Sequence, residues 1–390
     1  MTQVYGCGFV NVTDDTILEA FLPEGIISWE GENNGRDNGC KPKLDYAGRL
    51  LFIAADNDPE SETYGLPRYL VRATRIPGSP FDLIDVAVAE LPELNEGGDQ
   101  PIPNQLTVDN NGVAYFPGGS VLDDSGNPSI IKAVITGEIE GTLTVEYTIT
   151  PVGAQGYFHG TYCVTLSKDH LFVATYGSSP GGNGGDSILD YDCATLTYYD
   201  SVNLRYAEET PYNMETDCAV GSPNLGWAYV IVGTEPPVGG TIEAFLMPDL
   251  SEQGATYETE PEGLEAVLSV GKLDDVIAPG MLFTMERLNR TPGNSNLVYK
   301  YTPSGAGAVV FSESFAFNNP MNTPTHLDNR RDDQDAVWAG SSISPEAEAP
   351  TTPGGVEENK EGVDDNKQTR IGYVCIGTAA KRETYFPPVP

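Results

Sequence analysis

Histidine is the side chain best suited to acid–base chemistry and to zinc binding near neutral pH. The chain of 390 residues contains three, His159, His170 and His326. No two of them have the short spacing of a local zinc site, so a site built on them would have to be assembled from distant segments. His170 lies in a predicted turn, where we expect it to face solvent. His159 and His326 each precede a predicted strand and are the better ligand-binding candidates, with structural or surface roles as the alternative.

Alternating carboxylates in the segment Asp56-Asn57-Asp58-Pro59-Glu60 could hold a metal ion. Asp56, Asp58 and Glu60 have the spacing by which a turn can wrap oxygen ligands around Ca²⁺. The rest of a calcium-binding loop does not follow in the sequence, so a solvated turn is the alternative. We expect no cofactor, with calcium at this segment as the one exception that the sequence suggests.

One segment matches the Gly-x-Ser-x-Gly motif of a nucleophile elbow, Gly177-Ser178-Ser179-Pro180-Gly181. That motif needs a helix directly after the serine, and here proline and several glycines follow, so the segment predicts a loop. The glycine-rich stretches elsewhere do not join a strand to a helix, which excludes a phosphate-binding loop. The sequence therefore carries no convincing catalytic signature.

Strands must position any of these side chains. Residues 103–116 predict a β-hairpin, because an apolar strand, an Asp-Asn-Asn-Gly turn and a second apolar strand follow one another. Similar turns recur near residues 48, 112, 169, 226, 280 and 335, which are 54 to 64 residues apart. Each interval has room for two hairpins, and this is the pattern of a four-stranded β-propeller blade.

We therefore predict an all-β fold, a six-bladed β-propeller of four-stranded antiparallel blades. A seventh blade is the alternative if residues 1–30 form a degenerate one. Otherwise residues 1–30 are an N-terminal arm or closing hairpin that adds a strand to the last blade, and residues 31–390 form the propeller. In the fourth blade we expect the first strand at Cys218–Gly221, and in the last blade we expect a strand at Arg382–Phe386.

Two polar insertions interrupt the repeat. Residues 177–186 are rich in glycine, and residues 341–369 form a long acidic loop that is also rich in proline. Long polar loops are either disordered or used for contacts. We expect contacts with an assembly partner, because a propeller presents its loops on two flat faces.

The charge balance excludes some partners. With 57 Asp and Glu against 21 Lys and Arg, the net charge is −36, which repels nucleic acid and anionic lipid surfaces. No apolar run is long enough for membrane insertion. The first residues lack the features of a secretory leader, so we expect the protein to act where it is made or to leave by packaging into a particle. An acidic surface can also serve only solubility or tolerance of salt.

The six cysteines are too sparse for a disulfide scaffold. Cys7 and Cys375 lie in predicted strands near the two ends of the propeller, so a disulfide between them is a candidate for closing the ring. The alternative is that both are buried free thiols, because cysteine is often buried.

The segment Pro103-Asn104-Gln105-Leu106, followed by Asp109-Asn110-Asn111-Gly112, resembles a blade of NHL-type and gluconolactonase-like propellers. The segment His170–Gly177 is similar to a lactonase blade. The resemblance covers single blades and is mainly a signature of fold. It implies a metal-dependent lactonase in which Asn104 helps to hold a divalent metal on the axis. The family's other metal ligands have no match in this sequence.

Two functional hypotheses follow. The first is a non-catalytic propeller that acts as a structural or attachment component of an extracellular assembly, with a virion or phage tail as the setting. Its partners would be other proteins of the assembly, or a surface receptor or glycan. The second is a metal-dependent lactonase-like hydrolase, with Asn104, His159 and His326 near the axis. Cytoplasmic localisation is the alternative to the extracellular one.

Overall fold

The computed structural model describes just over half of the chain in many short ranges. The described residues are 6–11, 43–45, 49–55, 67–76, 79–103, 105–109, 111–119, 121–152, 160–176, 187–204, 210–217, 221–233, 241–247, 250, 257–258, 266–270, 280, 282–286, 297–316, 323–328, 336–343 and 368–375. All regular elements in these ranges are β-strands. None of these ranges forms a helix long and apolar enough to cross a membrane.

The described strands fall into sets of four that follow the chain order. The bounds are β2 (Lys43–Leu44), β3 (Leu50–Ala55), β4 (Pro67–Ile76) and β5 (Ser79–Glu90); β6 (Thr107–Val108), β7 (Ala114–Pro117), β8 (Ser129–Ile139) and β9 (Thr142–Pro151); β10 (Gly160–Ser167), β11 (His170–Tyr176), β12 (Ser187–Asp192) and β13 (Tyr198–Asn203); β14 (Thr210–Thr216), β15 (Trp227–Gly233), β16 (Thr241–Leu246) and β17 (Tyr257–Glu258); β18 (Ala266–Val270), β19 (Leu282–Glu286), β20 (Leu297–Gly305) and β21 (Ala308–Ala316); and β22 (Thr323–Asp328), β23 (Ala336–Ile343) and β24 (Gln368–Cys375) with β1 (Gly6–Asn11).

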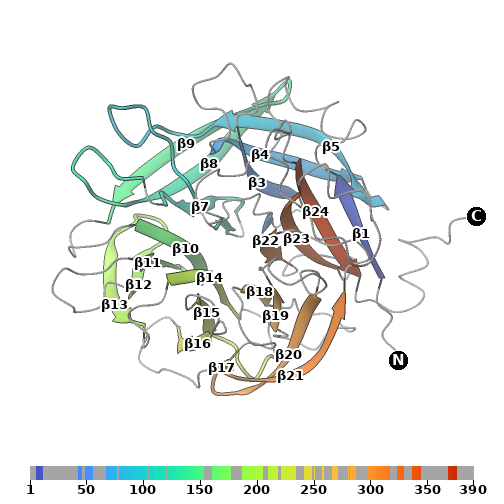
Figure 1. The fold of residues 1–390 in the computed structure, drawn as a ribbon. Helices are drawn as coiled ribbons and strands as arrows, with labels where there is room; N and C mark the ends of the chain where they lie inside the picture. Colours follow the sequence, from blue (N-terminus) through green and yellow to red (C-terminus); the bar gives the residue numbers. More distant parts are fainter. Residues whose placement is uncertain are drawn as a thin grey trace, which may run out of the picture.

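The sets are arranged in a ring (Figure 1). Within each set, neighbouring strands pair in antiparallel order, and one parallel bridge between β5 and β9 merges the first two sets into a single eight-stranded sheet. The first strands of successive sets contact one another, from β2 to β6 and onward to β22. The ring returns to its start where β1 contacts β5. This is the architecture of a β-propeller, which confirms the predicted fold class.

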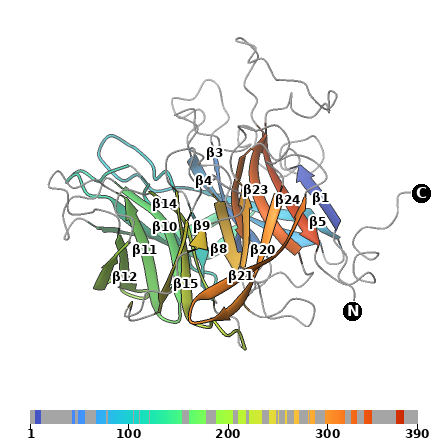
Figure 2. The same ribbon diagram turned by 60° about the horizontal axis from the view of Figure 1, so that its bottom comes forward.

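The last sheet combines the two ends of the described chain. β1 pairs with β24 in antiparallel register, from Gly6 opposite Cys375 to Asn11 opposite Arg370. Figures 1 and 2 both show β1 beside β24. Cys7 lies opposite Val374, one register position from Cys375 on the neighbouring strand. The predicted disulfide between these cysteines is not tested by this register and stays a prediction.

Buried apolar side chains fill the seams between successive sets. Each seam combines residues from two neighbouring sheets, and full burial of one such side chain stabilises the fold by about 1.5–3 kcal/mol. Representative pairs of members, from the first seam to the fourth, are Leu70 and Ile131, Tyr115 and Leu171, Phe172 and Phe245, and Tyr229 and Tyr301. The alternation of apolar residues in the strands therefore serves face-to-face stacking.

The Asp-x-x-Gly turn that predicted the hairpin at residues 103–116 forms as expected. The Asp109 carboxylate accepts hydrogen bonds from the backbone N–H groups of Asn111, at 2.8 Å, and Val113, at 2.9 Å. Gly112 has a φ of 82°, which favours glycine. Asp123 forms the same bonds with Ser125 and Asn127 between β7 and β8.

Some predicted strands differ from the observed ones. The first strand of the fourth set is β14, which ends before Cys218. Its sequence, Thr-Pro-Tyr-Asn-Met-Glu-Thr, is mostly polar and lacks the apolar alternation that predicts a strand. Its last residues, Glu215 and Thr216, are polar but buried. The strand predicted at 382–386, the loop predicted at 177–186 and residues 344–367 of the loop predicted at 341–369 lie outside the described residues. The ends of that last predicted loop, 341–343 and 368–369, lie in β23 and β24.

Gly119 links the second and third sets and should not tolerate a side chain. Its φ is 72°, and a Cβ added there would lie 2.0 Å from the carbonyl oxygen of Ile102. We expect Gly119→Ala to lower the free energy of unfolding by about 3 kcal/mol or more, because left-handed strain and overpacking add. Chemical denaturation measures the loss.

Gly112→Ala is the matched control. Gly112 also has positive φ, 82°, but a Cβ there would meet no atom within 4 Å. This substitution should cost only about 1 kcal/mol from backbone strain. Equal losses for the two variants would show that the contact with Ile102 is not the cause.

Candidate functional site

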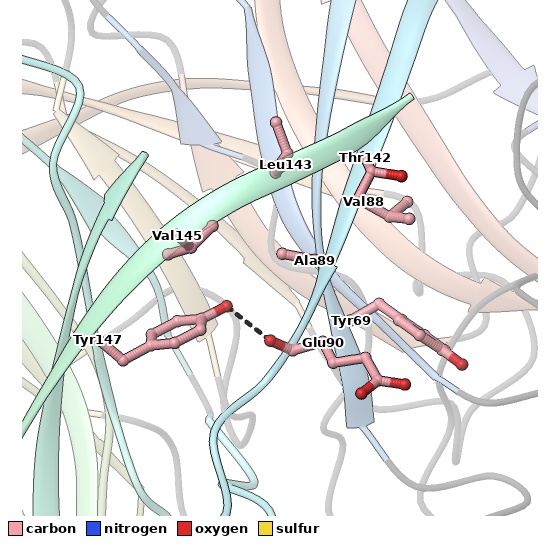
Figure 3. A pocket seen from close by; sticks show the side chains of 8 residues that line it. All are labelled: Tyr69, Val88, Ala89, Glu90, Thr142, Leu143, Val145 and Tyr147. Atoms are coloured by element: carbon pink, nitrogen blue, oxygen red, sulfur yellow. Dashed lines mark hydrogen bonds between the residues drawn. The ribbon is translucent and has the colours of Figure 1, made fainter. Parts of the chain in front are cut away.

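A pocket opens between the first two sets, at the outer side of the ring. β5 and β9 meet there at one parallel pair, Val88 opposite Thr142. The Val88 N–H donates to the Gly141 carbonyl at 2.9 Å. Beyond this contact the two strands diverge, and a cavity of about 340 Å³ lies between them (Figure 3). Its lining residues are Tyr69, Val88, Ala89, Glu90, Thr142, Leu143, Val145 and Tyr147.

Strand alternation provides the apolar wall of the pocket. Along β9, Leu143, Val145 and Tyr147 are buried or half-buried, while the residues between them are exposed. Val145 and Tyr147 pack against the apolar seam between the first two sets. Side chains at every second strand position share a face, so these three point toward the first set.

Tyr147 is held in place by one hydrogen bond. Its hydroxyl donates to the backbone carbonyl of Glu90 at 2.9 Å, across the gap between β9 and β5 (Figure 3). Burial raises the pKa of Tyr147 well above its ordinary value, so the hydroxyl stays protonated and remains a donor. The tyrosine hydroxyl therefore bridges β9 and β5 beside the pocket.

The opposite rim carries an aromatic ring and a carboxylate. Tyr69 on β4 lies directly opposite Glu90 on β5 in the strand register. The Glu90 carboxylate is 65% exposed and lies 3.4 Å from the Arg68 guanidinium. The same guanidinium lies over the ring of Tyr69, 5.7 Å from its centre. An exposed ion pair of this length contributes little to stability, so water or a ligand can compete for Glu90.

A second constellation spans the centre of the ring. Lys43 in β2 and Glu215 in β14 form an ion pair with both side chains almost fully buried, at 0% and 1% exposure. β2 begins the first set and β14 begins the fourth. Going round the ring, two sets separate them in either direction. The ion pair therefore crosses the axis of the propeller.

Gln105, just before β6, extends this network. Its side-chain amide donates to the Met214 carbonyl at 2.7 Å and approaches Glu215 at 3.5 Å. Its side-chain oxygen accepts from the backbone N–H groups of Val164 and Met214. One glutamine thus joins the second, third and fourth sets. We call Lys43, Gln105 and Glu215 the axial network.

A histidine–carboxylate pair lies in the third set. The Nδ1 atom of His170 is 2.9 Å from the nearer Asp190 oxygen, and the imidazole is stacked on Phe172. Burial raises the pKa of Asp190, and the hydrogen bond with His170 opposes part of that rise. His170 begins β11 and is only 27% exposed, so the expectation of a solvent-facing turn residue was wrong. The sequence did not reveal that β12 would place Asp190 beside it.

Most of the predicted site residues lie outside the described part of the chain. These are Asn104, His159, Asp56, Asp58 and Glu60. His326 lies in β22, opposite Gly340 of β23. The site predicted on these residues therefore stays a prediction. In the ranges that it describes, no group of three or more His, Cys, Asp or Glu side chains is arranged to hold a metal ion.

The site residues that sequence reasoning missed have weak signals. Gln105 stands beside the predicted ligand Asn104, but its partners are about a hundred residues away in the sequence. Lys43 and Glu215 are charged residues in strands, and a charge in an inner strand is the one signal that could have marked them.

Comparison with known proteins adds information on the fold. No protein family model matches the chain, and no curated protein matches it. Among solved structures, it is similar to the α-L-arabinofuranosidase Arb93A of Fusarium graminearum, with a TM-score of 0.54 and 10% identity over 94% of this chain and 96% of that one. At this identity the likeness shows the fold alone.

Two further solved structures are similar at lower scores. The β-propeller domain of Cps50 (Swd1) from Myceliophteria thermophila has a TM-score of 0.43 and 11% identity over 87% of this chain and 96% of that one. The WD40 domain of Toxoplasma gondii coronin has a TM-score of 0.45 and 9% identity over 99% and 91%. The β-propeller fold of the chain rests on the ring of sheets described above.

The axial network should be important for stability. We expect Lys43→Met to lower the free energy of unfolding by about 3–5 kcal/mol, because it leaves the Glu215 carboxylate buried without its cation. Lys168→Met, at an exposed lysine of the β10–β11 turn, should change stability by less than about 0.5 kcal/mol. Urea denaturation compares the two. Equal effects would contradict a buried ion pair.

Cys193 should be an unreactive thiol. Burial, with the nearby Asp109, Asp192 and Asp169 carboxylates, raises the pKa of Cys193 to about 12. Alkylation of the native protein by iodoacetamide at pH 8 should therefore be at least about tenfold slower than alkylation of the protein unfolded in urea, because the thiolate is the nucleophile. Mass spectrometry of the Cys193 peptide measures both rates. The native rate should rise steeply only as the pH approaches this pKa, and equal rates at pH 8 would refute the prediction.

Proposed function

We propose that the chain is a non-catalytic propeller that acts as a structural or attachment component of an extracellular assembly, with a virion or tail as the setting. Its partners are other proteins of the assembly, or a surface receptor or glycan. We further propose that the ring has six blades. One observation carries this proposal: the axis is crossed by the axial network of Lys43, Gln105 and Glu215.

The axial network supports a structural role because its two charged side chains pair with each other. Ligand sites of propellers need room in the central channel that the blades surround. Here a buried lysine and glutamate neutralise each other, and a glutamine bonds to backbone groups of the third and fourth sets. A substrate would have to displace a buried ion pair, which is costly. The arrangement favours the outer surface of the ring as the place for contacts.

The outer surface offers features that suit a partner. The pocket between β5 and β9 opens outward, and its rim carries an exposed carboxylate and two tyrosines. Tyrosine is enriched where proteins contact one another. The net charge of −36 favours a partner with a basic face and opposes one made of nucleic acid.

Density-gradient fractionation of extracellular particles from the source organism tests the proposal. We expect the protein to sediment with the particles at a constant ratio to their main protein, and to remain bound after a wash in high salt. Immunogold labelling should place it at the particle surface. Recovery only in the particle-free fraction would overturn the assembly role.

A parallel assay addresses catalysis. Purified protein loaded with Ca²⁺ or Zn²⁺ should show no stoichiometric bound metal and no hydrolysis of aldonolactones. A bound divalent ion together with lactone turnover would refute the non-catalytic role and support the lactonase hypothesis instead.

A further inference from the structure

We infer that the pocket between β5 and β9 binds one basic side chain, a lysine or arginine, of a partner protein. The inference deepens the proposed function, because it names the chemistry by which the outer surface of the ring would recognise a partner. It rests on the pocket walls, the groups at the rim and the charge around them.

The cavity suits one long side chain. Its volume of about 340 Å³ is near the lower end for small-molecule sites. Val88, Leu143 and Val145 form apolar walls. Lysine and arginine bury their methylene stems against apolar surface and keep the charged end near water. The stem of a basic side chain can therefore lie between β5 and β9.

The rim provides partners for the cationic end. Glu90 and Tyr69 lie side by side at the pocket (Figure 3). The protein's own Arg68 already uses this pair, 3.4 Å from Glu90 and 5.7 Å from the centre of the Tyr69 ring. A carboxylate beside an aromatic face is a favourable site for guanidinium or ammonium. Arg68 shows that this corner accepts such a group, and it competes with an incoming one.

The charge of the surroundings favours a cation over other occupants. Glu140 and Glu146 are exposed near the pocket, on the β8–β9 turn and on β9, while Arg72 is paired with Glu138. With the net charge of −36, this surface attracts basic partners and repels acidic ones. An acidic peptide is therefore excluded. A neutral sugar is the alternative ligand, and the test below includes one.

Ligand titration by NMR tests the inference on the purified full chain. The probe is Nα-acetyl-arginine N-methylamide. Two ligands serve for comparison: the norleucine analogue, which has an apolar side chain without a charge, and methyl glucoside, which is a neutral sugar. We expect the arginine probe to bind and to shift the signals of Tyr69 and Tyr147. We expect weaker binding of the norleucine analogue and none of the sugar. Equal binding of arginine and norleucine probes, or tighter binding of the sugar, would overturn the inference.

Three variants sharpen the test. Glu90→Gln should weaken binding of the arginine probe about fivefold, and Arg68→Ala should strengthen it, because it removes the competing guanidinium. Glu146→Gln is the matched control, since it removes one carboxylate from β9 without altering the pocket lining. It should change the affinity less than twofold, and an equal effect of Glu90→Gln and Glu146→Gln would refute specific recognition.

A second measurement separates folding from recognition. Glu90 is 65% exposed, so thermal unfolding of Glu90→Gln should match the parent protein. Ala89→Met narrows the cavity and should weaken binding of the arginine and norleucine probes alike. Failure of the probe to bind would overturn this inference but leave particle association untouched. Loss of particle association would overturn the proposed function but leave the titration valid.

Discussion

The buried ion pair between Lys43 and Glu215 is the interaction on which the centre of the structure depends. Apolar seams join each set of strands only to its neighbours. The ion pair instead joins the first and fourth sets, which lie on opposite sides of the ring. A charge buried without a partner is strongly unfavourable, so each of these side chains requires the other. Their contact is available only when the sheets are arranged around a common axis.

The inner and outer polar groups differ in what they contact. At the axis, Gln105 bonds to backbone groups of two other sets and approaches Glu215, so polar groups from distant segments contact one another inside the protein. At the outer pocket, the Glu90 carboxylate is mostly exposed and lies 3.4 Å from the Arg68 guanidinium. The axial network holds the sheets together, whereas the Glu90 carboxylate can still bind another molecule. This contrast is the physical basis on which we propose a structural role for the axial network and a role in recognition for the outer pocket.

Local patterns were enough to predict much of the fold. The Asp109 turn and the alternating strands such as Ser187–Asp192 and Trp227–Gly233 carry their own signals, and repetition of those signals implied a propeller. β14 was missed because its buried face is polar, with Glu215 serving a contact across the axis. β18 (Ala266–Val270) was also missed. The axial network and the His170–Asp190 pair join residues far apart in the sequence, so no local pattern could reveal them. The pocket depends on how two strands diverge, which is a property of the closed ring.

The pairing of β1 with β24 has a consequence for how the protein folds. Asn11 lies opposite Arg370, so β1 finds its neighbour only after all the residues between them have been synthesised. Until β24 is made, β1 has no strand to pair with, and the last sheet lacks its two outer strands. Contacts of such high sequence separation slow folding and lengthen the time in which sheet edges are open to other chains. Protection of newly made chains by chaperones would therefore matter most before this final strand is in place.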